Sequence, residues 1–182
     1  MYVWGRMLRV ALTSRGRGPF REGDESRLQF RCLPTDIDPN LHLNNARYMM
    51  LADMGRLDIF FRSGLMSVAR KNGWGPMMGG LQSVYVREIK LWSRFDIVST
   101  MDTWQGTQIL GRHRFVLQDG RTAATLLTTA GVYDFRNRAF LMIDDVVHTL
   151  GYDASPRQMS EAESAFLENH QRLRKSVRHR IS

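Results

Sequence analysis

The pattern of apolar and polar positions begins with a short strand followed by a long helix. Residues 26–33 alternate apolar Leu28, Phe30 and Cys32 with polar neighbours, which is the period of a half-buried strand. Residues 46–64 contain no proline and end in Ser-Gly, which is typical of a helix with a glycine stop. The apolar residues of this segment form two stripes that cover most of its circumference. The pattern therefore predicts a helix that is buried on most sides.

The second half of the chain has the pattern of a sheet. Residues 65–73 predict a second, short helix, and residues 74–80 (WGPMMGG) predict a connection, because glycine and proline interrupt regular structure. Four runs rich in β-branched and aromatic residues then predict strands at 81–92, 95–105, 108–118 and 121–135. The breaks between these runs are short, so we expect neighbouring strands to be antiparallel.

This order of elements predicts an α+β fold in which a curved antiparallel sheet wraps around the long central helix. The chain has 182 residues and 43% hydrophobic content, which is enough for one domain with a real core. We expect that domain to span residues 25–140. A basic amphipathic segment, residues 1–24, precedes it, and a C-terminal helical extension with a basic tail, residues 141–182, follows it.

The net charge of +8 belongs to the two ends of the chain. Residues 1–21 and 171–182 together hold ten basic residues and no acid, which leaves 16 basic residues against all 18 acids elsewhere. Because the body has no basic excess, we expect no nucleic-acid partner, and a binder that uses the short tails is the least favoured alternative.

The N-terminal segment combines apolar residues with Arg6 and Arg9, and it is too short and too charged for a membrane-spanning helix or an ordinary signal peptide. It predicts an amphipathic helix that docks on its own domain or on a neighbour. The alternative is peripheral contact with an anionic membrane surface.

The chain has one cysteine, Cys32, which excludes an internal disulfide and a cysteine-built zinc site. We expect Cys32 to be a small core residue and the protein to be cytoplasmic. The histidines other than His42 are far apart and have no companion ligands at metal-binding spacing, so we expect no metal and no cofactor.

Residues 35–45, TDIDPNLHLNN, concentrate short polar side chains just before the long helix. Asn44 is a favourable N-cap residue, which would leave the backbone N–H of Asn45 and its neighbours at the positive end of the helix dipole. Asp38 precedes the helix by about one loop. The stretch therefore predicts that a carboxylate and an anion-stabilising helix terminus lie close together.

The same stretch carries a resemblance to a known family. A strand ends in Thr-Asp-x-Asp, His-x-Asn-Asn follows, and then Tyr48 lies on a helix ahead of an Asp-x-x-Arg segment at 53–56. This order resembles the hot-dog-fold thioesterases of the 4-hydroxybenzoyl-CoA thioesterase type. The fuller stretch LHLNNARYM, with SGL after the helix, is most similar to the thioesterase superfamily member 6-like branch.

The resemblance implies hydrolysis of an acyl thioester of coenzyme A or of an acyl-carrier protein. Thioester hydrolysis needs a carboxylate that attacks or activates water, and donors for the developing oxyanion. The catalytic position of the family matches Asp38, whereas Asp36 is then a turn or cap residue. The resemblance also implies a homodimer or tetramer with the substrate groove at a subunit interface. The expected site residues are Asp38, Asn45 and His42 for catalysis and Asn44, Tyr48, Arg47 and Arg87 for substrate binding.

Other interpretations of these residues stay open. Asp-Pro and Asn-Asn are turn and cap formers that any strand-to-helix loop can use. His42 is either a general base or a loop histidine that binds backbone. Leu41 stands where many relatives carry Gly, and Asn45 stands where some carry His or Tyr. These two departures favour a non-catalytic acyl-thioester or lipid-binding protein as the first alternative.

An enoyl-CoA hydratase is a further alternative, because DIDPNLH is similar to the Asp-x-Asn-Pro-x-His signature of that group. The spacing differs by one residue. Asp and His are five positions apart in that signature, whereas Asp36 and His42 are six apart and Asp38 and His42 are four apart.

Overall fold

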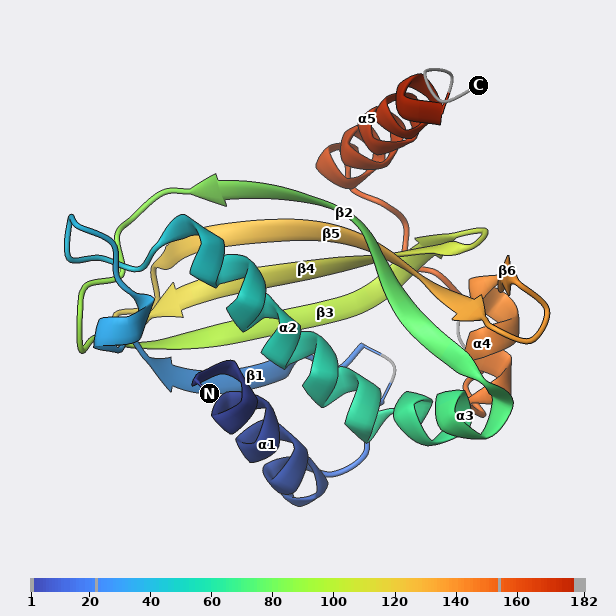
Figure 1. The fold of residues 1–182 in the computed structure, drawn as a ribbon, viewed down its shortest axis with the longest axis horizontal. Helices are drawn as coiled ribbons and strands as arrows, with labels where there is room; N and C mark the ends of the chain where they lie inside the picture. The colour runs from blue at the N-terminus through green and yellow to red at the C-terminus, as the bar shows by residue number, and fades with distance from the viewer. Residues whose placement is uncertain (1, 22, 154, 179–182) are drawn as a thin grey trace.

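The computed structural model describes residues 2–21, 23–153 and 155–178, and it has the α+β architecture that the sequence predicts (Figure 1). A curved antiparallel sheet wraps around one long helix, α2 (Asn45–Arg62). The strands are β1 (Ser26–Arg31), β2 (Trp74–Tyr85), β3 (Arg94–Gln105), β4 (Gln108–Leu117), β5 (Thr122–Asp134) and β6 (Ala139–Phe140). The other elements are the helices α1 (Tyr2–Ser14), α3 (Leu65–Asn72), α4 (Ile143–Thr149) and α5 (Glu161–Arg178), with 3-10 turns at Arg15–Arg17 and Pro34–Asp36.

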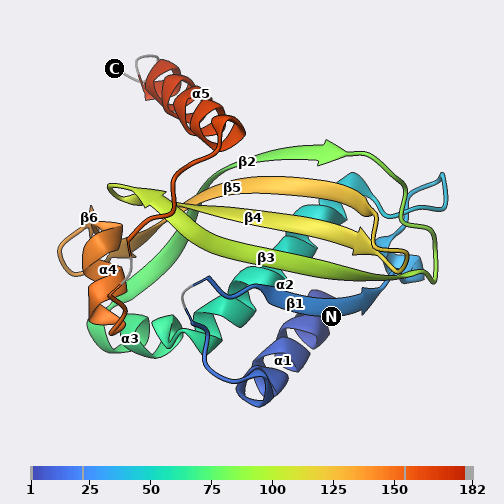
Figure 2. The ribbon, with the colours of Figure 1, turned by 180° about the vertical axis from the view of Figure 1, so that it is seen from behind.

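The strand order is β1-β3-β4-β5-β2, and the short β6 pairs with β5. Consecutive strands from β3 to β5 are antiparallel neighbours, as the short breaks predict. Strand β2 crosses to the far side of the sheet and pairs with β5, so β1 and β2 form its two edges. Seen from behind, the sheet covers α2, and α5 projects away from the body (Figure 2).

The prediction of a connection at residues 74–80 is wrong, because these residues form the first half of β2. Proline is tolerated here because β2 is an edge strand, where a missing N–H costs no ladder hydrogen bond on the open side. Pro76 pairs in register with Val132 of β5. The strand also ends at Tyr85, seven residues before the predicted end.

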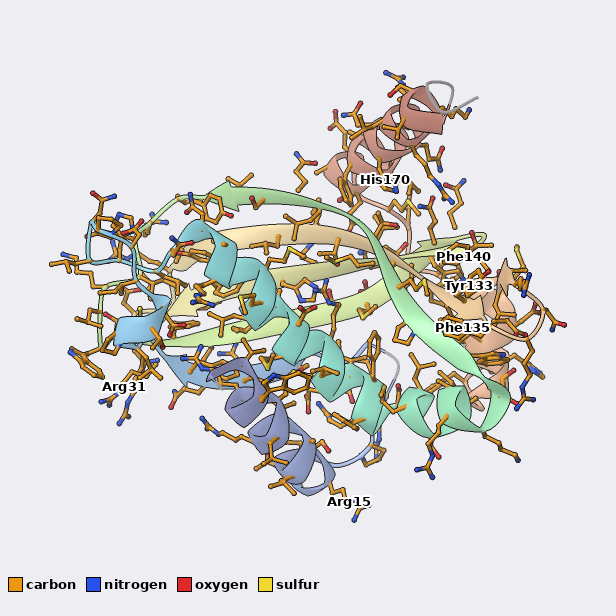
Figure 3. All side chains as sticks on the ribbon, in the orientation of Figure 1. Arg15, Arg31, Tyr133, Phe135, Phe140 and His170 are labelled. Carbon is orange, nitrogen blue, oxygen red and sulfur yellow. The ribbon has the colours of Figure 1, made fainter. Side chains whose placement is uncertain are left out.

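The glycines of β2 mark close approach rather than turns. A Cβ at Gly75 would lie 2.7 Å from the ring of Phe135, and a Cβ at Gly80 would lie 2.5 Å from the ring of His170. Both rings lie over β2, one from the loop after β5 and one from α5 (Figure 3). Gly79 falls in a register shift between Met78 and Gly80. Glycine at both positions leaves room for these side chains where they lie.

The two apolar stripes predicted for α2 differ in burial. The first, which runs from Tyr48 to Ile59, is fully buried, and the second, which includes Met54 and Phe61, is partly buried. Every member of the first stripe is buried: Tyr48, Leu51, Ala52, Gly55 and Ile59. In the second stripe Met54 is buried, whereas Phe61 is 36% exposed. The second stripe is therefore only partly covered by this chain.

Two apolar clusters fill the space between α2 and the sheet, and a polar row separates them. The first cluster surrounds Tyr48 and Phe115, and the second surrounds Phe60 and Trp104. The row consists of Ser99, His113 and Thr128, one residue from each of β3, β4 and β5. Because side chains alternate along a strand, each of these residues lies between a member of the first cluster and a member of the second on the same face of its strand.

His113 is fully buried in this row. Its Nδ1 lies 2.8 Å from Ser99 Oγ, and its Nε2 lies 3.3 Å from Thr128 Oγ1, which itself donates to the carbonyl of Gly111. Burial, aided by the charge of Arg56, lowers the pKa of His113 to about 3, so the ring is neutral. Gly55 of α2 packs against Ser99, because a Cβ there would lie 2.0 Å from Ser99 Oγ.

Helix α1 is bound to the domain by two buried carboxylates. Arg6 donates to Asp36 at 2.8 Å, and Arg17, just after α1, donates to Asp58 of α2 at 2.6 Å. Both carboxylate side chains are 0% exposed. Val10 packs into the first cluster. The prediction of a helix docking on its own domain is confirmed.

The predicted C-terminal helices are present as α4 and α5. Arg157 and Arg112 bind the buried carboxylate of Glu163 at the start of α5, each at 2.9 Å. These bonds lower the pKa of Glu163 to about 2 against the opposing effect of burial. The last part of the predicted basic tail, residues 179–182, lies outside the described residues.

Candidate active site

The polar stretch forms a tight turn that leads into α2. Ile37 and Leu43 pair as an isolated antiparallel bridge, and the N–H of Asp38 donates to the carbonyl of His42 at 3.0 Å. Leu41 closes the turn by donating to the carbonyl of Asp38 and takes a positive φ of 61°. A non-glycine residue in this conformation is uncommon. Leu41 therefore combines a backbone conformation typical of glycine with a leucine side chain.

The turn is fixed to the sheet side of the molecule by the segment after β2. Leu43 donates to the carbonyl of Ile89 at 2.8 Å, and His42 and Lys90 form an isolated bridge. Ile89 is fully buried. The backbone that carries Asp38 is thus held on both sides.

The Asp38 carboxylate is half-buried, with 17% of its side chain exposed. One oxygen, Oδ1, accepts from the N–H of Asn40 at 2.9 Å. The other, Oδ2, lies 3.5 Å from Nδ1 of His42, whose side chain is 30% exposed. One carboxylate oxygen is thus used to hold the turn, and the other is paired with an imidazole at the surface.

The N-terminus of α2 supplies a hydrogen-bond donor beside this turn. Asn44 is the N-cap, as predicted, and its side chain accepts from the N–H of Ala46 at 2.9 Å. The N–H of Asn44 donates to the carbonyl of Asp36 at 2.9 Å, which joins the helix cap to the loop before Asp38. Among the described residues, the N–H of Asn45 has no acceptor, so it is available to a ligand.

The predicted substrate-binding residues lie in different surroundings. Tyr48 is only 2% exposed and packs against the rings of Tyr85 and Phe115, and burial raises its pKa. Arg47 is half-buried in the first turn of α2. Arg87 is exposed just after β2, where it donates to the carbonyl of Thr122 at 2.9 Å.

Tyr85, which no sequence pattern indicates as a site residue, connects these groups. Its hydroxyl lies 3.4 Å from the carbonyl of Asn45, so the end of β2 meets the start of α2. Arg87 follows two residues later. The geometry brings Asp38, His42, Asn44 and Asn45 together at one junction, with Arg87 beyond Tyr85 at its border.

Asp36 has the turn role that the sequence predicts and also a partner that the sequence did not reveal. Its carboxylate accepts from the N–H of Leu33 at 2.9 Å and from Arg6 of α1. Burial raises its pKa, and the bond from Leu33 opposes this effect. No local signal could identify Arg6, which is 30 residues away in sequence.

Among the described residues, no group of three or more His, Cys, Asp or Glu side chains could hold a metal ion. Within the same part of the chain, none of the helices has the length and apolar character needed to cross a membrane.

The model of the thioesterase-like superfamily matches residues 32–169 of this chain. The chain belongs to this superfamily. Membership places it in the general class of thioester hydrolases. The matched range starts just before the turn that carries Asp38 and includes all of the sheet after β1.

Curated relatives agree with this membership and with the branch that the sequence resembles. Protein THEM6 of Xenopus laevis is 30% identical over 150 residues, which cover 75% of this chain and 72% of that relative. Protein THEM6 of Danio rerio is 30% identical over 129 residues, which cover 70% of this chain and 64% of that relative.

Solved structures establish the fold as the hot-dog fold. The probable thioesterase YbaW from Escherichia coli superposes with a TM-score of 0.64 at 19% identity, covering 69% of this chain and 95% of that structure. Slr0204 from Synechocystis, a 1,4-dihydroxy-2-naphthoyl-CoA thioesterase, superposes with a TM-score of 0.61 at 7% identity, and the match covers 70% of this chain and 95% of that structure. The protein SAV2348 from Staphylococcus aureus, solved in complex with CoA, gives a TM-score of 0.61 at 12% identity, covering 79% and 94%.

Proposed function

We propose that the protein hydrolyses an acyl thioester of coenzyme A or of an acyl-carrier protein at the junction of the Asp38 turn and α2. The observation that carries this proposal is a half-buried Asp38 carboxylate in the turn that leads directly into the N-terminus of α2, to which the bond from Asn44 to the carbonyl of Asp36 joins it. The N–H of Asn45 there has no acceptor among the described residues. A carboxylate and a backbone donor are the two groups that thioester hydrolysis requires.

Asp38 can act in either of two ways. As a general base, it takes a proton from water, and the water oxygen adds to the thioester carbon. As a nucleophile, its own oxygen adds to that carbon, and water later hydrolyses the resulting anhydride. In both routes the carbonyl oxygen becomes an oxyanion that accepts from the N–H of Asn45, and the C–S bond then breaks to release the thiolate.

The remaining candidate residues take supporting roles. His42, 3.5 Å from Asp38, orients the carboxylate or exchanges a proton with it. Asn44 fixes the start of the helix by capping it. Arg47 and Arg87 supply positive charge for the phosphates of a coenzyme A carrier. Tyr48 contributes as a buried wall rather than as a polar contact.

The test compares Asp38→Asn with Asp145→Asn, which changes an exposed carboxylate on α4. A panel of acyl-CoA substrates is hydrolysed by each purified protein and by wild type. Asp38→Asn should lower turnover at least ~100-fold, the scale of a lost acid, base or nucleophile, while Asp145→Asn should not. Equal turnover in Asp38→Asn and wild type contradicts the assignment. Wild type that binds acyl-CoA without hydrolysing it supports the acyl-binding alternative instead.

We also propose that the protein is a homodimer or tetramer that pairs through β2. This strand has an open edge in the single chain and exposes Met78 (40%) and Val84 (54%). Exposed apolar edges are hazardous unless they are paired. Light scattering should show at least a dimer for wild type and a smaller particle for Val84→Lys, whereas Val177→Lys on α5 should leave the mass unchanged. A monomeric wild type at micromolar concentration contradicts the proposal.

Helix α1 is a candidate for peripheral contact with an anionic membrane surface. Trp4, Leu8 and Leu12 form an exposed row, from 60% to 72% exposed, at helical spacing. Cosedimentation with phosphatidylserine vesicles should therefore exceed that with phosphatidylcholine vesicles. Leu8→Ser should weaken it, while Leu173→Ser, which changes an exposed leucine of α5, should not. Equal loss in both variants would exclude a specific role of α1.

A cytoplasmic location is part of this proposal. It rests on the single cysteine, Cys32, which leaves no internal disulfide and is compatible with a reducing compartment. Fractionation of cells that express the full chain tests it.

A further inference from the structure

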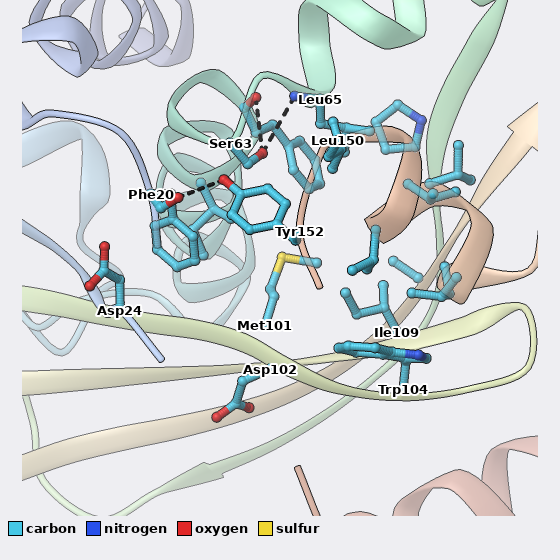
Figure 4. Close-up of a pocket in the computed structure, with 18 of the residues that line it drawn as sticks. Phe20, Asp24, Ser63, Leu65, Met101, Asp102, Trp104, Ile109, Leu150 and Tyr152 are labelled. Carbon is cyan, nitrogen blue, oxygen red and sulfur yellow. Dashed lines mark hydrogen bonds between the residues drawn. The ribbon is translucent and has the colours of Figure 1, made fainter. Parts of the chain in front are cut away.

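The second apolar cluster surrounds a cavity of about 390 Å³ (Figure 4). The cavity lies between the C-terminal half of α2, helix α4 and strands β3 to β5. Its walls include the members of the cluster themselves: Phe60, Leu65, Trp104, Val132, Ile143 and Val146. The side chain of Met101 reaches into it from β3 (Figure 4). This part of the core is therefore hollow.

The cavity is separate from the junction that holds Asp38. Ile59, which lines the cavity, is 14 residues after Asn45, or roughly 20 Å along the axis of α2. The buried row of Ser99, His113 and Thr128, together with the first apolar cluster, fills the space between the two places. A molecule in the cavity would not touch the candidate catalytic groups.

The interior of the cavity suits an apolar molecule. The indole N–H of Trp104 already donates to Asp144 at 2.9 Å, and the hydroxyl of Tyr152 already donates to the carbonyl of Phe20 at 2.6 Å. These polar groups therefore have protein partners, and a polar ligand would gain little inside. An apolar ligand that fills such an interior gains free energy from the contacts that the walls otherwise lack.

The charged residues of the cavity lie at its exposed rim. Asp102 is paired with Arg157 at 3.0 Å, and both side chains are more than 30% exposed. Arg21 is exposed on the same rim and offers a cation to a carboxylate. Asp24 also lies there, and its carboxylate accepts from the backbone N–H of Arg21 at 2.7 Å. An apolar interior with a charged rim fits a molecule that has one hydrocarbon chain and one polar end.

We propose that this cavity binds a single-chain fatty acid, with the chain inside and the carboxylate at the rim beside Arg21. The volume lies near the lower end of the range for small-molecule sites, roughly 300–1,000 Å³, which favours one chain over a two-chain lipid. The proposal goes beyond thioester hydrolysis, because binding here requires neither Asp38 nor a thioester.

The first test titrates the purified full chain with the fluorescent fatty acid cis-parinaric acid. Dodecanoic acid should displace the probe, and coenzyme A should not. Val146→Phe places a ring in the cavity and should weaken binding at least ~10-fold, because the added volume takes the space of the chain. Val177→Phe is the matched control: it makes the same change on α5, beside a second hollow between α5 and β2.

Three results would overturn the proposal. They are an absence of displaceable binding, displacement by coenzyme A, and loss of binding in Val177→Phe with retention in Val146→Phe. Circular dichroism and thermal unfolding must show that each variant is folded.

A second measurement needs no variant. A fatty acid with a photoreactive diazirine is bound to wild type and irradiated, and the labelled peptides are identified by mass spectrometry. Labels should fall on α4 and on the Met101–Trp104 segment of β3, and dodecanoic acid should suppress them. Labels confined to other segments would refute the assignment of the cavity even if Val146→Phe failed to fold.

Discussion

His113 should make the unfolding free energy of this protein depend on pH between about 6.5 and 3. The ring is fully buried, and its pKa is lowered to about 3, against about 6.5 in an unfolded chain. Above pH 6.5 the ring is neutral in both states and contributes nothing to the pH dependence. Between pH 6.5 and 3 the unfolded chain binds a proton that the folded protein does not, so acidification favours unfolding.

The expected size follows from the difference between the two pKa values. Each pH unit within this window costs about 1.4 kcal/mol, so a fall from pH 7 to pH 5 should remove about 2 kcal/mol of unfolding free energy through His113 alone. The total stability of a domain is only about 5–15 kcal/mol, so the effect is measurable.

The assay is urea unfolding, followed by circular dichroism at several pH values between about 7 and 5. His113→Gln removes the titrating ring, so its unfolding free energy should fall less steeply with acidification than that of wild type. His148→Gln changes an exposed histidine of α4 and should keep the slope of wild type. The reasoning fails if wild type and His113→Gln have the same slope, or if nuclear magnetic resonance shows His113 titrating near pH 6.5.

Three further changes test the junction and the packing around α2. Asn45→Ala should keep most of the turnover, because the backbone donor remains. Asn45→Pro should lose the turnover while circular dichroism shows the fold intact, and equal hydrolysis by both variants refutes the oxyanion role. In urea unfolding, Gly55→Ala should lower the unfolding free energy of the protein by about 1–3 kcal/mol, because the new Cβ overlaps Ser99. Gly5→Ala on α1 should be neutral or slightly stabilising, because a Cβ there meets open space. Asp58→Ala should destabilise by about 3–5 kcal/mol by urea unfolding, because it removes the fully buried carboxylate that Arg17 and Arg62 share. A loss below about 1 kcal/mol contradicts that role.

Local periodicity was sufficient for most of the fold. The alternation in residues 26–33 and the two stripes of residues 46–64 reflect burial against the same sheet, so each element shows its own pattern. Residues 74–80 could not be predicted in this way. Their glycines respond to the rings of Phe135 and His170, which come from remote parts of the chain.

The candidate site was predictable where it is local and not where it depends on distant partners. Asn44 caps α2 through a bond to Ala46, two residues away, and capping preferences of single residues indicate such a bond. The contact of Tyr85 with Asn45 spans 40 residues. Likewise, no pattern in one sequence indicates that a row of polar residues from three strands divides the core.

The two ion pairs of α1 determine how this chain can be shortened or tagged. A form that begins after residue 24 keeps β1, α2 and the whole sheet but removes Arg6 and Arg17, the partners of two carboxylates with no exposed surface. One of these carboxylates, on Asp36, belongs to the residue whose backbone carbonyl holds Asn44 at the start of α2. Loss of α1 would therefore disturb the turn beside Asp38 from a distance. A purification tag is better placed after α5 than before α1, and activity measured on a truncated form would underestimate that of the full chain.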